Sequence, residues 1–150
     1  MISAKRWITR SATARTNNSK KMQATSQLVF VYGTLRRGGS NHFRMAGAEF
    51  VAAGTITGRM YRIDWYPGLV LDVAGDEIHG DLYAVGPELL DAVDRFEGLS
   101  AGEIEGSEYR RVQTSVVQQD SQVRLAWVWE WCGITEESQR LADGDWLKVE

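Results

Sequence analysis

Glycine and proline divide the apolar parts of this chain into short runs that suit strands better than helices. The runs are rich in β-branched and aromatic residues, which favour β-structure. The predicted strands are Leu28–Tyr32, Phe50–Ile56, Arg59–Ile63, Leu69–Val73, Ile78–Val85, Tyr109–Gln118 and Gln122–Cys132. The first run is continuously apolar, which is typical of a strand buried on both faces. Gly58 is interpreted as a break between strands, and Gly80 as a bulge or a point of close backbone approach.

Only one long segment has the signals of a helix. Pro87 suits the first helical position, Glu88 suits the first turn, and Gly98 is a usual stop. A helix is therefore predicted from Pro87 to about Glu97, with shorter ones around 41–48 and before Gly144. Many strands without regular strand–helix alternation predict an α+β fold. We expect a small antiparallel or mixed, barrel-like sheet with one main helix and one or two short flanking helices.

Charge divides the chain into two parts. Residues 1–26 hold six of the 17 basic residues and no acidic residue, and all 15 glycines come later. Residues 27–150 hold 11 basic residues and all 20 acidic ones, a net charge of −9. The first segment lacks apolar periodicity and is predicted to be a disordered basic arm. It fits a transit-like presequence or a weak polyanion-binding tail. Alternatively, the protein starts at Met22 and the residues before it are not part of it. Residues 27–150 are predicted to form one domain.

Composition excludes several classes of protein. With 43% hydrophobic residues the chain is not globally disordered. No apolar run approaches the roughly 20 residues of a membrane-spanning helix. One cysteine excludes a disulfide framework and a cysteine-built zinc site, and two histidines do not form a metal site alone. An acidic domain without a basic–aromatic stripe argues against nucleic-acid binding. Trp127, Trp129 and Trp131 alternate along one strand, so they share one face and are interpreted as core.

Glu97 is the carboxylate that the predicted helix directs inward. At about 100° per residue, its apolar side chains cover about 120° of the helix surface, and Glu97 falls inside that arc. The arc consists of Leu89, Leu90, Val93 and Phe96. Burial raises the pKa of a carboxyl group, and a pKa nearer neutrality suits general acid–base catalysis. Alternatively, Glu97 ends the helix or pairs with an arginine such as Arg110.

A glycine- and arginine-rich loop, Gly33–Ser40, follows the first predicted strand. Its glycines allow backbone N–H groups to turn toward an anion. It is not a P-loop, because Gly39 and Ser40 stand where lysine and serine or threonine are required. The alternative interpretation is a tight exit from the strand.

Several short motifs, taken together in their order and spacing along the chain, resemble those of the gamma-glutamylcyclotransferase-like superfamily. The resemblance is strongest to its small bacterial members and to the gamma-glutamylamine cyclotransferases. The resemblance covers Leu28 to about Leu147. Its motifs are residues 29–38 (VFVYGTLRRG) with Asn41 and His42, 66–68 (YPG), 80–83 (GDLY), 90–98 (LDAVDRFEG), 109–112 (YRRV) and 144–146 (GDW).

This resemblance implies a small mixed β-barrel with flanking helices. It implies that Glu97 is the catalytic acid/base and that Tyr32, Gly33, Thr34 and Leu35 form the floor of the substrate cavity. Tyr109 and Asn41 match further pocket positions. The implied reaction converts a γ-glutamyl amine or γ-glutamyl amino acid into 5-oxoproline and a free amine.

The resemblance further implies a cytoplasmic, monomeric enzyme without metal or cofactor. The small-molecule γ-glutamyl substrate would be its only partner, with no nucleic acid and no membrane. Two other function classes stay open. One is a non-catalytic module that binds a small amine- or carboxylate-bearing metabolite in the same cavity. The other is an acidic interaction domain that binds no small molecule.

We expect a chain that starts at Met22 to keep full stability and activity, because the arm has no proposed part in the reaction. Thermal unfolding and product release measure the two properties. A large loss of either would show that residues 1–21 contribute to the domain.

Overall fold

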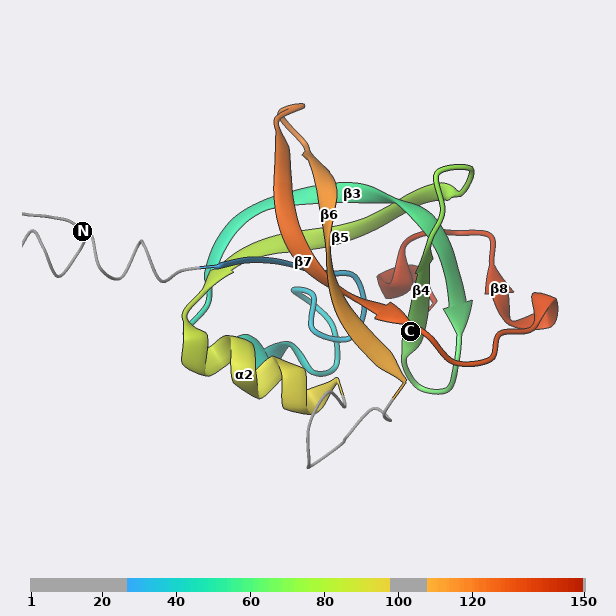
Figure 1. The fold of residues 1–150 in the computed structure, drawn as a ribbon, viewed down its shortest axis with the longest axis horizontal. Helices are drawn as coiled ribbons and strands as arrows, with labels where there is room; N and C mark the ends of the chain where they lie inside the picture. Colours follow the sequence, from blue (N-terminus) through green and yellow to red (C-terminus); the bar gives the residue numbers. More distant parts are fainter. Residues whose placement is uncertain (1–26, 98–107, 150) are drawn as a thin grey trace, which may run out of the picture.

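The computed structural model describes residues 27–97 and 108–149, which form a closed, mixed β-barrel (Figure 1). The barrel strands are β2 (Gln27–Val31), β3 (Glu49–Arg62), β5 (Asp76–Val85), β6 (Tyr109–Gln118) and β7 (Val123–Trp131). They pair in the order β3–β5–β2–β7–β6, and β6 pairs back onto β3 to close the ring. β2 and β7 are parallel, and the other pairs are antiparallel. The predicted fold class is confirmed.

Smaller elements extend this barrel. β4 (Pro67–Leu71) and β8 (Arg140–Leu141) both pair with the second half of β3. The helix α2 (Pro87–Phe96) lies outside the barrel, below β2 and β7 in Figure 1. Three single turns of 3₁₀ helix complete the fold: η1 (His42–Met45), η2 (Glu137–Gln139) and η3 (Trp146–Lys148). The short helix expected over 41–48 is the turn η1. The stop expected at Gly98 lies outside the described residues.

Side chains of β2 contribute to two separate hydrophobic cores. Phe30, together with Tyr32 just beyond the strand, packs in the first core, between the sheet walls and the buried Trp146. Val29 and Val31 point the other way, into the second core, which includes Val93 and Phe96 of α2. The strand is therefore buried on both faces, which explains its continuous apolar sequence.

The same alternation continues in β7. Trp129 and Trp131 belong to the second core, on the side of α2, with Trp127 packed against it. Ala126 and Val128 face the first core and are almost fully buried. The tryptophans share one face, as predicted, and the small side chains of Ala126 and Val128 lie on the opposite face, toward the barrel interior.

The prediction of a strand break at Gly58 is wrong, because β3 runs without interruption from Glu49 to Arg62. A Cβ atom on Gly58 would lie 2.7 Å from the carbonyl oxygen of Val70. The glycine therefore permits close approach of the neighbouring strand instead of ending its own. Gly80 has a similar function, since its Cβ would lie 2.4 Å from the carbonyl oxygen of Val31. The register irregularity of β3 lies elsewhere, between Phe50 and Ala52.

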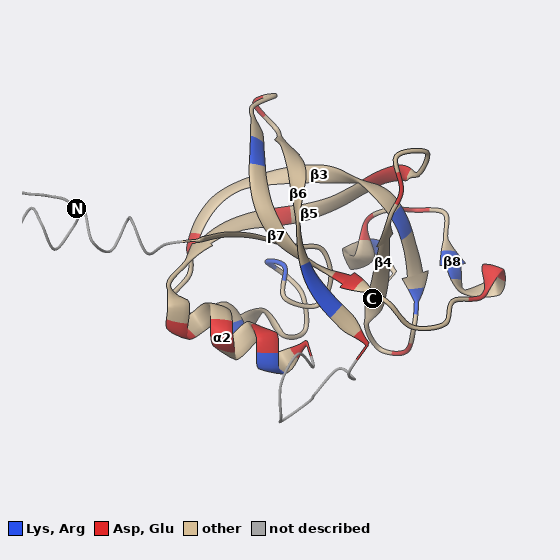
Figure 2. Cartoon of the chain, viewed as in Figure 1, with Lys and Arg blue, Asp and Glu red and all other residues tan. Residues whose placement is uncertain are grey.

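Charged residues lie on α2 and on several strands (Figure 2), and those described are exposed or half-buried apart from Arg36, Asp81, Glu97 and Glu130. Within the described ranges, no helix has the length and apolarity needed to cross a bilayer.

Two buried tyrosines differ in what their hydroxyl groups contact. The Tyr32 hydroxyl donates to the Trp129 carbonyl at 2.7 Å and accepts from the Leu69 N–H at 3.3 Å. The Tyr83 hydroxyl is buried without a hydrogen-bond partner among the described residues. Burial, together with the charge of Asp81, raises the pKa of Tyr83 to about 12, although Arg37 opposes the shift.

Tyr32→Phe is expected to lower the free energy of unfolding by about 1–3 kcal/mol, because it leaves two buried backbone groups without this partner. Tyr83→Phe removes a hydroxyl that has already lost its hydration, so we expect no destabilisation beyond about 0.5 kcal/mol. Urea unfolding of both variants measures the difference. Equal losses would contradict the hydrogen-bonding assignment.

Candidate active site

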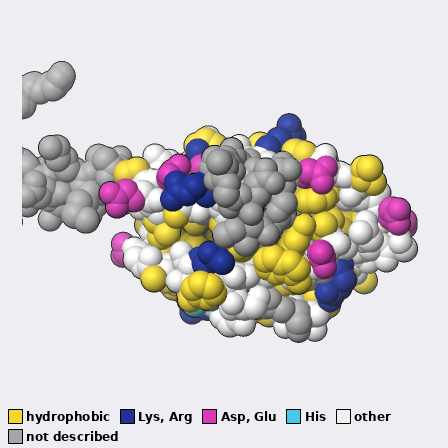
Figure 3. Space-filling view, turned by 90° about the horizontal axis from the view of Figure 1, so that it is seen from below, with side chains coloured by type: hydrophobic (Ala, Val, Ile, Leu, Met, Phe, Trp, Pro, Cys, Tyr) yellow, Lys and Arg dark blue, Asp and Glu magenta, His cyan; other side chains and the backbone are white. Residues whose placement is uncertain are grey.

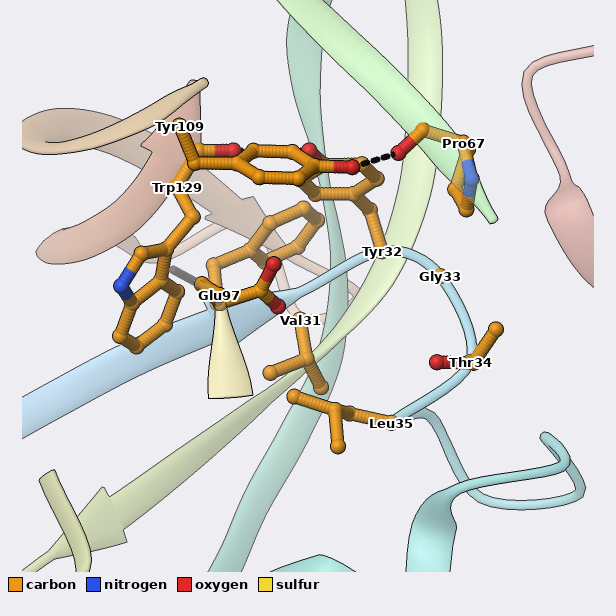
Figure 4. Close-up of a pocket in the computed structure, with 10 residues that line it drawn as sticks. Val31, Tyr32, Gly33, Thr34, Leu35, Pro67, Glu97, Tyr109 and Trp129 are labelled. Carbon is orange, nitrogen blue, oxygen red and sulfur yellow. Dashed lines mark hydrogen bonds between the residues drawn. The ribbon is translucent and has the colours of Figure 1, made fainter. Parts of the chain in front are cut away.

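A narrow pocket opens where β2 ends, between the loop after it, the start of β4, the end of α2 and strands β6 and β7 (Figure 4). It contains about 300 Å³ of empty space, part of it open to solvent. Six of the predicted site residues line it, namely Tyr32, Gly33, Thr34, Leu35, Glu97 and Tyr109. Phe30, Val31, Pro67 and Trp129 complete the lining. Residues far apart in the sequence are thus brought to one place.

Glu97 is the C-cap of α2, and its N–H donates to the Val93 carbonyl at 2.9 Å. Its side chain turns into the pocket, toward the rings of Tyr32 and Tyr109 (Figure 4). Only 8% of the residue is exposed. Arg110, the arginine considered as an alternative partner, contacts Glu130 at 3.0 Å. Glu97 is the one charged side chain among the described residues that line the pocket.

Two tyrosines fix the wall opposite α2. The Tyr109 hydroxyl donates to the Pro67 carbonyl (Figure 4), and the Tyr32 hydroxyl accepts from the N–H of Leu69, two residues further along β4. Their rings therefore stand between the barrel and β4. This arrangement leaves the aromatic faces and edges to form the pocket surface.

The loop after β2 is held tightly against this wall. A Cβ atom on Gly33 would lie 2.7 Å from the Pro67 ring, so glycine is required there for the close contact. Gly38 has a φ of 86°, a conformation that favours glycine. The Asn41 N–H donates to the Thr34 carbonyl at 2.9 Å, and the Asn41 side chain accepts from Arg44. Asn41, a predicted pocket residue, does not line the pocket but closes the loop.

Two aspartates that the sequence interpretation did not single out anchor this loop. The buried Asp81 accepts from the Arg37 N–H at 3.0 Å, and its carboxylate lies 3.6 Å from the Arg37 side chain. Asp145 contacts Arg36 at 2.6 Å. Both aspartates follow a glycine whose Cβ would clash with a neighbouring strand. The repeated Gly–Asp pair was the available signal in the sequence.

Asp94 positions the helix that carries Glu97. Its carboxylate accepts from the Trp129 indole N–H at 2.9 Å and lies 3.2 Å from the Arg111 side chain. At about 100° per residue, Asp94 falls about 40° outside the apolar arc of α2. Its partners come from β6 and β7, so the projection contained no sign of them.

The described residues contain no group of three histidine, cysteine, aspartate or glutamate side chains arranged to hold a metal ion. The His42 ring contacts the Leu35 carbonyl at 3.0 Å, so it takes part in the loop structure.

Comparison with known proteins assigns this architecture to a family. The family profile described as "Gamma-glutamyl cyclotransferase, AIG2-like" matches residues 29–148. The chain belongs to the AIG2-like gamma-glutamyl cyclotransferase family. The match spans the barrel from the third residue of β2 onward, α2 and every described residue that lines the pocket.

Individual members of the AIG2-like family agree with this assignment. A Vibrio cholerae protein, provisionally named a gamma-glutamylcyclotransferase, is 31% identical over 81% of this chain and 96% of its own length. An Arabidopsis thaliana protein with the same provisional name is 38% identical over 53% of this chain. The chain spans about half the length of that relative, 48%.

Solved structures show the same fold. A protein from Pyrococcus horikoshii superposes with a TM-score of 0.64 at 26% identity, covering 83% of this chain and 92% of its own. A mouse AIG2-like protein superposes with the same TM-score at 24% identity, covering 75% of this chain and 81% of its own. The mouse structure is evidence for the fold alone.

Asp145→Asn is expected to lower stability at pH 7 by about 1–3 kcal/mol, because it leaves the buried Arg36 without its charged partner. Burial raises the pKa of Asp145, but the hydrogen bond and charge of Arg36 outweigh it, and the net pKa is lowered. Because this pKa is lowered, ionised Asp145 stabilises the fold above the unfolded-state pKa of about 3.9. This stabilisation is lost as the pH falls further. The difference between wild type and variant should therefore shrink below about pH 4 in urea unfolding. A constant difference would contradict the ion pair.

Proposed function

We propose that this protein converts a γ-glutamyl amine or γ-glutamyl amino acid into 5-oxoproline and a free amine, with Glu97 as general acid and base. Family membership supports the class of reaction. The observation that carries the proposal is the buried carboxylate of Glu97, placed in a pocket whose floor is the loop from Tyr32 to Leu35.

The reaction joins two ends of one substrate. The α-amino nitrogen attacks the γ-carbonyl carbon, a new C–N bond closes a five-membered ring, and the original amide C–N bond breaks. Only the neutral amine attacks, so a base must first take a proton from the α-ammonium group. An acid must then give a proton to the departing amine. One carboxylate can perform both steps in turn, and no net proton is consumed by the protein.

The pocket suits this use of Glu97. With 8% of the residue exposed, the ionised carboxylate has lost most of its hydration, which favours its accepting a proton. The other side chains of the described lining are apolar or aromatic, except that of Thr34. A narrow pocket of this kind would hold the substrate folded with its amine near its carbonyl, and such proximity supplies a large share of the rate.

Backbone N–H groups of the loop from Gly33 to Leu35 would donate hydrogen bonds to the negatively charged oxygen atoms of the substrate. The substrate carries an α-carboxylate, and an oxyanion forms on the γ-carbonyl oxygen in the transition state. The described lining contains no cationic side chain, which leaves backbone donors for these anions. The anchors Asp81 and Asp145 keep the loop rigid for this purpose.

Incubation with a panel of γ-glutamyl amines and γ-glutamyl amino acids tests the proposal, with 5-oxoproline and free amine measured together. Equal release of the two products supports the cyclotransferase. Binding without release, measured by calorimetry on the same panel, would favour a non-catalytic module. Neither binding nor release would favour an interaction domain.

On the best substrate of that panel, Glu97→Gln is expected to lower kcat at least about 10²-fold, the lower end for loss of a general acid–base. Glutamine keeps the size of the side chain, so unfolding should be little changed. Glu88→Gln is the matched control, because Glu88 lies on the same helix but is exposed. Near-normal turnover by Glu97→Gln would contradict the assigned role.

A further inference from the structure

A second hollow adjoins the candidate active site. It lies between η1 and α2 and contains about 870 Å³ of empty space, part of it open to solvent. Leu35 lines both hollows, and Phe96 of the second directly precedes Glu97 of the first. We call it the Arg44 groove, after the arginine that lines it together with Leu35, Phe43, Arg95 and Phe96. On the face seen from below, basic and hydrophobic side chains lie next to each other (Figure 3).

Arg44 is held in place without a negative partner. Its guanidinium carbon lies 4.6 Å from the centre of the Phe96 ring and 5.0 Å from that of Phe43. Its Nε donates to the Asn41 side chain at 3.1 Å. No described carboxylate forms an ion pair with it, whereas Arg95 in the same groove pairs with Asp91. The groove therefore offers one oriented and uncompensated positive charge.

The position of the Arg44 groove indicates which half of a γ-glutamyl substrate it would contact. If the bond that breaks lies at Glu97 and the glutamyl half occupies the pocket floor, the Arg44 groove, which shares Leu35 with that pocket, is the neighbouring space for the remainder of the substrate. That remainder is the leaving amine. A guanidinium stacked on aromatic rings is well suited to bind a carboxylate through two hydrogen bonds.

We infer that Arg44 is a specificity residue that binds a carboxylate on the leaving amine. The preferred substrates are then γ-glutamyl amino acids rather than γ-glutamyl derivatives of neutral alkylamines. This inference rests on the proposed function, and it assigns a role to a residue outside the pocket that contains Glu97.

Two substrates isolate the carboxylate. γ-Glutamylalanine and γ-glutamylethylamine have leaving amines that differ only by a carboxylate group. We expect wild-type kcat/KM to be at least about tenfold higher for γ-glutamylalanine, the effect of one charge-assisted hydrogen-bonded contact. Arg44→Gln should lower kcat/KM for γ-glutamylalanine to the value for γ-glutamylethylamine and leave the latter nearly unchanged.

Two further variants control for changes in folding. Arg44→Lys retains the charge without the planar guanidinium, so it should retain part of the preference. Arg124→Gln removes an arginine on the β6–β7 hairpin that contacts Gln118, and should retain all of it. Circular dichroism and urea unfolding report the amount of folded enzyme in each sample, independently of the rate on either substrate.

Three outcomes would overturn the inference. Wild-type enzyme without a preference, or a preference that survives in Arg44→Gln, would show that Arg44 does not bind this carboxylate. An equal fall for both substrates would place Arg44 against the shared glutamyl half. In each of these cases 5-oxoproline is still formed and the proposed function stands. Absence of 5-oxoproline from every γ-glutamyl compound, with folded protein, would overturn both.

Discussion

The buried hydroxyl of Tyr32 connects three strands at the rim of the barrel. It stands one residue beyond β2 and bonds to the backbone of β7 and of β4. Because both backbone groups are shielded from water, each needs such a partner. The same contact sets the distance between the barrel wall and β4, and the candidate active site occupies the space beside it. The position of β4 against the barrel rim and the shape of the pocket therefore both depend on this side chain.

Electrostatic contacts then fix the loop after β2 and the helix α2 to the barrel. Asp81 and Asp145 hold the loop after β2 from two sides, and Asp94 holds α2 against β7. These three carboxylates are paired with cations or N–H donors. Glu97 differs from them in facing a pocket whose described lining holds no cation. The acidic character of the domain thus has two uses, one in structure and one in the proposed chemistry.

Much of the fold follows from local patterns. The strand β6 and the start of α2 lie where the sequence predicts them, and β2 is shifted by only one residue. Glu97 was found by projection on a helix, since its inward direction depends on only a few neighbouring residues. Patterns failed at Gly58, where a glycine indicates a turn or a close approach equally well. The neighbouring strand β4 decides between them, because its Val70 carbonyl lies too close to Gly58 to leave room for a Cβ atom.

Local sequence is enough to indicate the family of the chain, its α+β class, the inward carboxylate and the loop that lines the pocket. Each of these is written in contiguous residues, through periodicity, capping or a short motif. Only the folded chain shows the closure of β6 onto β3, the anchoring by Asp81, Asp94 and Asp145, and the absence of an ion pair between Arg44 and any described carboxylate. The contacts join residues about 30 to 110 positions apart in the sequence. The lack of an ion pair at Arg44 depends on which described side chains lie near it. A charge has no fixed partner until the barrel closes, and local sequence does not specify which side chains then meet.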